Sequence, residues 1–244
     1  MNEQRRRPFW FTSRMTARER RFALIYLPIH IFLLPLLAGY LVPDDSIRSS
    51  MIANLIYHGV SLLLVMVFTM GFLRREFDTV CDRPLRLLTT IFIGYGLTLA
   101  LDSLLGQLLE IFFRGAASFS LDNPNNSVIM DAYEGFKGPV TVVTVLMAPI
   151  LEEVLFRGGL FGTLMKKNRA LAYIVTVAVF SLYHVWQSAI QDPRQLLYAV
   201  SYIGSSLVLC WAYERSNTIW APIGLHMVTN LIALRALELL RAMP

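Results

Sequence analysis

Charged residues are scarce in this chain. Of its 244 residues, 16% are Asp, Glu, Lys or Arg and 55% are hydrophobic, and the mean hydropathy is +0.53. This composition is more apolar than that of an ordinary soluble domain. The sequence therefore indicates a protein that crosses a membrane several times.

Cysteine is scarce as well. The two cysteines, Cys81 and Cys210, fall in a basic stretch and in an apolar segment, so neither a disulfide framework nor a zinc–thiolate cluster is indicated. The pattern His-Glu-x-x-His, which places two zinc ligands one helical turn apart, is absent. The sequence also contains no internal repeat, no heptad run and no separate soluble domain.

Positive charge is concentrated at the N-terminus. The formal net charge is +5, and much of the excess comes from seven arginines: Arg5, Arg6, Arg7, Arg14, Arg18, Arg20 and Arg21. A cluster of this kind, placed just ahead of an apolar run, typically faces lipid headgroups. We interpret residues 1–21 as a basic cytoplasmic tail and expect membrane lipid, with no nucleic acid, as a partner.

Seven apolar runs are long enough to cross the hydrocarbon core, which takes about 20 helical residues. They cover approximately residues 22–42, 52–73, 87–113, 139–165, 169–190, 195–213 and 218–240. Because lipid-facing backbone must satisfy its own hydrogen bonds, we predict an all-α, polytopic transmembrane bundle of seven or eight spans, in one domain over residues 22–244. The third run contains Asp102 and Glu110 and could bend or split. The polar stretch 114–138 could hold a short extra helix.

The orientation follows from the lysines and arginines between these runs. Basic stretches at the N-terminus, near 74–86 and near 166–169 alternate with stretches 43–51, 114–138 and 191–194, which have fewer basic residues. Basic loops usually stay on the cytoplasmic side, so we expect a cytoplasmic N-terminus.

Two adjacent carboxylates and an arginine lie inside the fourth apolar run. Such charges cost at least ~2.5–3.5 kcal/mol each in a bilayer core and usually mark function. Glu152 and Glu153 point in different directions on a helix, whereas Glu153 and Arg157 share a face one turn apart. We predict that Glu153 pairs with Arg157 and that Glu152 faces a cavity and accepts a proton from water. The alternative is a structural ion pair beside a glutamate that has no role.

Two later runs carry histidines with a partner one turn away. His184 follows Phe180 and could hold a water, ligate a metal, or bond a carbonyl of a neighbouring helix. His226 and Asn230 share a helix face and could donate jointly to one oxyanion, for which a preorganised donor is worth about 3–4 kcal/mol. They could instead join helices by hydrogen bonds. His30 and His58 have no such partner, and we expect them to serve packing.

Three elements of the chain resemble, in order and character, the motifs of the CPBP family, also called CAAX proteases, bacteriocin-processing or Abi proteins. They are Glu152-Glu153-x-x-x-Arg157, Phe180-x-x-x-His184 and His226-x-x-x-Asn230. The resemblance covers approximately residues 139–233 and implies an intramembrane endopeptidase. Glu152 and His184 would activate the attacking water, and His226 and Asn230 would stabilise the oxyanion. Glu153 and Arg157 would hold the site in place.

Two chemistries stay open for these residues. Glu152, His184 and His226 could supply three zinc ligands with water in the fourth position, and the family is often called a metalloprotease. A water activated by glutamate would need no metal and would use the same residues. We favour the metal-free chemistry slightly.

The predicted function is therefore peptide-bond hydrolysis on membrane-anchored proteins or hydrophobic peptides. In the family, eukaryotic members process prenylated Cys-a-a-X tails, and many bacterial members handle peptides or confer bacteriocin immunity. This compact chain is more similar to the bacterial kind, which implies the cytoplasmic membrane. One alternative is a non-catalytic immunity or peptide-binding protein that uses the same cavity. Another is a transporter, which would predict broken helices in two related halves.

Overall fold

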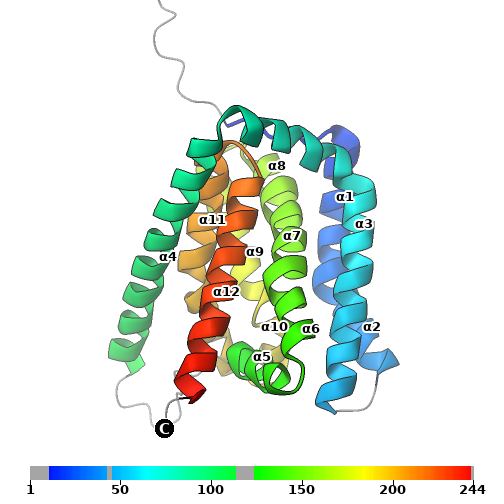
Figure 1. The fold of residues 1–244 in the computed structure, drawn as a ribbon, viewed down its shortest axis with the longest axis vertical. Coiled ribbons are helices and arrows are strands. Elements are labelled where there is room, and N and C mark those ends of the chain that lie inside the picture. The colour runs from blue at the N-terminus through cyan, green and yellow to red at the C-terminus, as the bar shows by residue number, and fades with distance from the viewer. Residues whose placement is uncertain (1–10, 43–45, 114–123, 243–244) are drawn as a thin grey trace, which may run out of the picture.

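The computed structural model describes residues 11–42, 46–113 and 124–242, with the side chains of 112–113, 124–127 and 240–242 excepted. Arg5, Arg6 and Arg7 of the expected tail, and the first ten residues of the stretch 114–138, lie outside these ranges. Every regular element in the described ranges is a helix, and the helices form one bundle (Figure 1). The prediction of an all-α membrane bundle is confirmed.

Five helical segments in the described ranges are long and apolar enough to cross a membrane. They are Ala17–Leu41, Ile47–Asp82, Pro84–Ile111, Lys137–Leu164 and Pro193–Ser216. A sixth apolar helix, α9 (Arg169–Tyr183), is shorter. The last, α12 (Trp220–Ala242), is long enough but less apolar, because it carries His226, Asn230 and Arg235. All seven expected runs are thus helical, and five of them have the length and hydropathy of a full span.

Three of the seven segments are composites of shorter elements. The first joins α1 (Ala17–Pro28), the π-helix η2 (Ile29–Leu33) and α2 (Leu34–Leu41). Next come α3 (Ile47–Asp82), α4 (Pro84–Phe113) and α5 (Pro124–Gly135). The central segment joins α6 (Lys137–Thr141), π-helix η3 (Val142–Met147), α7 (Ala148–Glu152), π-helix η4 (Glu153–Phe161) and α8 (Gly162–Leu164). After α9 come α10 (Trp186–Gln191), the 3-10 helix η5 (Pro193–Tyr202) and α11 (Ile203–Ser216), ahead of α12.

Several boundaries differ from the sequence-based expectation. Helix α1 begins inside the expected tail, because Thr16 and Glu19 form a reciprocal capping box at its N-terminus. The basic stretch near residues 74–86 is helical rather than a loop, since α3 runs to Asp82 and α4 starts at Pro84. Hydropathy does not detect these polar turns, because they extend beyond the apolar core of each helix.

The two uncertain segments of the sequence are resolved by the structure. The third run does not split: α4 is one helix of 30 residues that carries both Asp102 and Glu110. The stretch 114–138 does contain an extra helix, α5. The backbone of α4 stays helical at both acidic residues, because a carboxylate side chain does not remove a backbone hydrogen bond.

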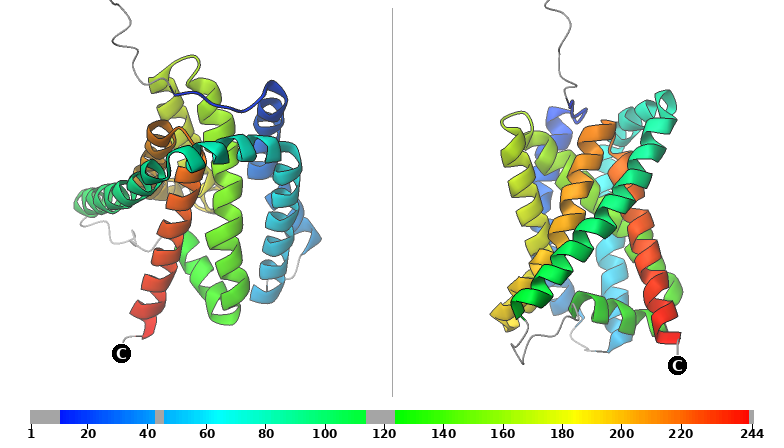
Figure 2. Two further views of the ribbon diagram at one scale, coloured as in Figure 1. Left: turned by 45° about the horizontal axis from the view of Figure 1, so that its top comes forward. Right: turned by 90° about the vertical axis from the view of Figure 1, so that its left-hand side faces the viewer.

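The main core packs α1 and α3 against the central segment. Its buried members include Ala23, Phe72, Leu155, Phe156 and Phe161. Figure 2 shows α4 running obliquely across the other helices. It approaches α12 closely at Gly94, where an added methyl group would lie 2.7 Å from a side-chain carbon of Leu225. Small residues at such crossings let membrane helices pack closely.

Candidate active site

The central segment buries both glutamates of the predicted motif. Glu152 ends α7 with a relative exposure of 5%, and Glu153 begins η4 with 0%. Arg157, on the next turn of η4, is also fully buried. Three ionisable side chains thus lie inside the bundle within six residues of sequence.

The ion pair predicted from spacing is present. Arg157 Nη1 donates to Glu153 Oε1 at 2.9 Å. Arg157 Nη2 donates to the carbonyl oxygen and the hydroxyl of Ser206 on α11, at 3.3 and 2.9 Å. The guanidinium carbon lies 4.2 Å from the centre of the Phe180 ring. Arg157 therefore connects the central segment to both α9 and α11.

His226 reaches both glutamates from α12. Its Nδ1 lies 2.8 Å from Glu153 Oε1, and its Nε2 lies 3.9 Å from Glu152 Oε2. When Nδ1 carries the proton, it donates to Glu153 and leaves Nε2 as an acceptor facing Glu152. The charged imidazolium could donate on both sides.

His184 approaches the same oxygen from α9. Its Nδ1 donates to the Phe180 carbonyl at 2.9 Å, since a carbonyl oxygen can only accept, and its Nε2 lies 4.0 Å from Glu152 Oε2. The ring stacks on Tyr202 with centroids 4.2 Å apart. The hydrogen bond to the Phe180 carbonyl fixes the tautomer of His184, and the hydrogen bond and the stacking together fix the orientation of its imidazole.

Asn230 lies one turn beyond His226 on α12. Its amide nitrogen donates to the Thr144 carbonyl on η3 at 2.9 Å. A carboxamide nitrogen carries two hydrogens, so this bond still leaves one N–H. The bond also fixes the direction in which that N–H points.

Four of the six predicted site residues line one cavity of about 760 Å³: Glu152, His184, His226 and Asn230. Glu153 and Arg157 do not line it. Glu152 Oε2 is buried and has no hydrogen-bond partner within the protein. The cavity wall therefore presents an unpartnered carboxylate oxygen near two imidazoles.

No group of three or more His, Cys, Asp or Glu side chains in the described ranges has an arrangement that could hold a metal ion. Glu152, His184 and His226 approach one another: Glu152 Oε2 lies 4.0 Å from His184 Nε2 and 3.9 Å from His226 Nε2. A carboxylate and two imidazoles are donor types that suit zinc.

The other histidines have different surroundings. His30 is fully buried and stacks on Tyr57, whose hydroxyl lies 3.0 Å from its Nε2. His58 donates from Nδ1 to the Asn54 carbonyl at 3.0 Å and lines the cavity away from the glutamates. Asp102 of α4 also lines it.

Some residues around the site carried no signal in the sequence. Ser206 anchors Arg157, Thr144 holds Asn230, and Tyr202 stacks on His184. Tyr57 and Tyr183 line the cavity beside them. Tyr183 directly precedes His184 in the chain, whereas Ser206, Thr144, Tyr202 and Tyr57 are identified only by the packing of separate helices.

The fold and this site define a polytopic helical membrane protein with a buried glutamate–histidine site. Residues 135–232 match the model of the family described as type II CAAX prenyl endopeptidase Rce1-like. This segment contains all six predicted site residues, and its match is similar in extent to the CPBP resemblance seen in the sequence.

Two curated proteins are similar to parts of the chain. The chain is 26% identical over 134 residues to the Bacillus subtilis protein named "Putative membrane peptidase YdiL", with 51% of each chain covered. It is 32% identical over 98 residues to the "Membrane-embedded CAAX protease MroQ" of Staphylococcus aureus, with 38% of each covered. The chain thus spans about half, or less, of the length of these relatives. No solved structure matches it significantly.

Proposed function

We propose that the protein is an intramembrane endopeptidase that hydrolyses peptide bonds of membrane-associated proteins or hydrophobic peptides. The observation that carries the proposal is the buried Glu152 oxygen, which has no partner in the protein and faces Nε2 of both His184 and His226 on the wall of a large cavity. The match of residues 135–232 to the Rce1-like family and the names of two relatives support it.

Glu152 and His184 would activate the water. The gap of 4.0 Å between Glu152 Oε2 and His184 Nε2 is too long for a direct hydrogen bond and suits a water bonded to both. Glu152 accepts a proton from this water while the water oxygen attacks the carbonyl carbon of the peptide bond. The C–N bond then breaks, and the same proton passes to the leaving amine. The products are a carboxylic acid and an amine.

His226 and Asn230 would stabilise the tetrahedral oxyanion. Asn230 offers the N–H that Thr144 does not use, and His226 donates from Nε2 when its ring is charged. Glu153 and Arg157 act as positioning residues, because they touch His226 and Ser206 but not the cavity.

This mechanism uses only side chains of the chain. Zinc, if the protein takes it, would be held by Glu152, His184 and His226 and would polarise the same water.

The proposed location is the cytoplasmic membrane, with a cytoplasmic N-terminus and membrane lipid around the bundle. A lipidated Cys-a-a-X tail is one substrate of the proposed class, and unmodified hydrophobic peptides are another. The competing function is a non-catalytic immunity or peptide-binding protein. It would use the cavity but would not need an unpartnered carboxylate beside two imidazoles.

Cleavage of a library of membrane-tethered reporter peptides by the purified protein tests the proposal. Wild type is compared with Glu152→Ala and His184→Ala, and Asp78→Asn is the control because this exposed carboxylate lies outside the cavity. The proposal expects cleavage by wild type and the control alone. Equal cleavage by all four proteins would refute the site, and tight binding of peptides without cleavage would favour the immunity or binding function.

A further inference from the structure

Lysines and arginines gather at one end of the bundle. They lie at the start of α1, around the α3–α4 junction, between α8 and α9, and at the end of α11, segments that meet at the top of Figure 1. Those in the described ranges are Arg14, Arg18, Arg20, Arg21, Arg74, Arg75, Arg83, Arg86, Lys166, Lys167, Arg169 and Arg215. We call this the basic end. The opposite end carries only Arg48, Lys137, Arg194, Arg235 and Arg241 in the described ranges.

The site is closed toward the basic end. Phe72, Phe161, Tyr213 and Ile219 are fully buried there in the main core. Hydrogen bonds tie the start of α12 to the upper part of α3: Trp220 Nε1 donates to the Leu73 carbonyl at 3.0 Å, and the Ile219 N–H donates to Glu76 at 3.0 Å. None of these core and hydrogen-bonded residues lines the cavity, so the described part of this end is packed rather than hollow.

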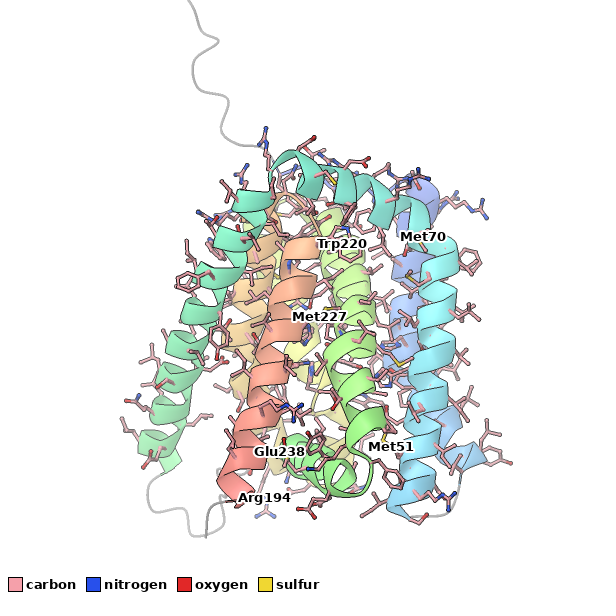
Figure 3. All side chains as sticks on the ribbon, viewed as in Figure 1. Met51, Met70, Arg194, Trp220, Met227 and Glu238 are labelled. Atoms are coloured by element: carbon pink, nitrogen blue, oxygen red, sulfur yellow. The ribbon has the colours of Figure 1, made fainter. Side chains whose placement is uncertain are left out.

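The cavity extends in the other direction. Along α12 it is lined from Leu225 to Leu237, and Figure 3 places Met227 midway along the bundle and Glu238 at the end opposite Trp220. Along α3 it is lined from Ser50 to His58, near the end where Figure 3 places Met51. Exposed residues such as Gly39, Asn54 and Gln187 belong to this wall. The cavity therefore opens away from the basic end.

Basic segments next to membrane spans remain on the cytoplasmic side. We infer that the cavity opens to the extracytoplasmic side of the membrane and takes polypeptide segments presented there. This inference rests on the proposed function for its substrate, since peptide hydrolysis is what the site would perform. The direction of the opening is inferred only from the positions of the basic end, the main core and the cavity-lining residues.

The described cysteines provide a direct test. Cys81 is exposed at the basic end, and Cys210 is buried. Intact spheroplasts that contain the protein are treated with a charged maleimide that does not cross membranes. Wild type reports on Cys81, and Asn54→Cys and Gln187→Cys, each combined with Cys81→Ser, report on the cavity. Detergent-solubilised protein gives full labelling for each site.

We expect both cavity cysteines to reach at least half of their full labelling in intact spheroplasts, and Cys81 to stay below a tenth until the membrane is opened. Labelling of Cys81 but of neither cavity cysteine would overturn the inference. Labelling needs no turnover, so this result stands apart from whether any peptide is cut. In a second arm, single-span reporters carry the cleavable sequence on one side or the other. Cutting only on the cytoplasmic side would also overturn the inference.

Discussion

Glu153 and His226, which are 73 residues apart in the chain, meet through a 2.8 Å contact between Oε1 and Nδ1. The same carboxylate oxygen accepts from Arg157 at 2.9 Å. One buried oxygen thus orients the imidazole of α12 and neutralises the arginine of η4. The two neighbouring glutamates consequently have different surroundings: Glu153 is paired, and Glu152 Oε2 has no hydrogen-bond partner.

Replacing Glu152 by glutamine should abolish proton transfer while preserving shape. An amide cannot accept the water's proton, and general-base catalysis is typically worth about 10²–10⁴-fold. We expect the single-turnover cleavage rate to fall by at least about 100-fold. The melting temperature should stay within a few degrees, since the change removes an unpartnered buried carboxylate. A rate close to that of wild type would contradict the assigned role.

Arg157→Met should destabilise the fold. The change leaves the carboxylate of Glu153 buried without its cation, and breaking a buried pair costs about 3–5 kcal/mol. The free energy of unfolding in mixed micelles measures the effect. The double variant Glu153→Gln with Arg157→Met should be more stable than Arg157→Met alone, because it leaves no unpaired charge. If the double variant is less stable than Arg157→Met alone, loss of the Glu153–Arg157 ion pair does not explain the destabilisation.

Zinc dependence is tested by chelation. We expect the cleavage rate of chelator-treated protein to stay within twofold of the rate of untreated protein, because the proposed mechanism needs no metal ion. Elemental analysis of the purified protein provides a second readout. Loss of activity with chelator, restored by zinc and accompanied by about one zinc per chain, would assign the metal to Glu152, His184 and His226.

Gly159→Ala should loosen the contact between α1 and η4. A methyl group there would lie 2.8 Å from Ala23 Cβ, and overpacking of this kind typically costs about 1–3 kcal/mol. Gly96→Ala is the matched control, since nothing lies within 4 Å of an added methyl group at that position of α4. Thermal unfolding of both variants in micelles measures the difference. Equal melting temperatures would show that α1 adjusts without cost.

The sequence predicted contacts within a helix better than contacts between helices. Spacing alone identified the Glu153–Arg157 pair, because residues four apart face each other on one turn. The motifs also identified four residues that share one cavity. The catalytic roles of these residues stay predictions until the variants are measured.

Contacts between helices could not be derived from the same pattern. Ser206 and Thr144 lie in other helices from Arg157 and Asn230, and their spacing in the chain carries no periodic signal. The π-helical form of η4 was not predicted either, since its residues are compatible with an ordinary helix. The extent of α3 was missed because its last turns are polar.

The core residues Phe72, Phe161, Tyr213 and Ile219 at the basic end do not line the cavity, whose wall extends toward the opposite end. If substrate enters from that opposite end, both peptide products of the proposed hydrolysis leave by the route through which the substrate arrived. A retained product would thus block the next substrate, so the steady-state rate would depend on how quickly the fragments return to the lipid or to water. Short, soluble fragments should clear fastest, and product inhibition should increase with the apolar length of the fragment that stays behind.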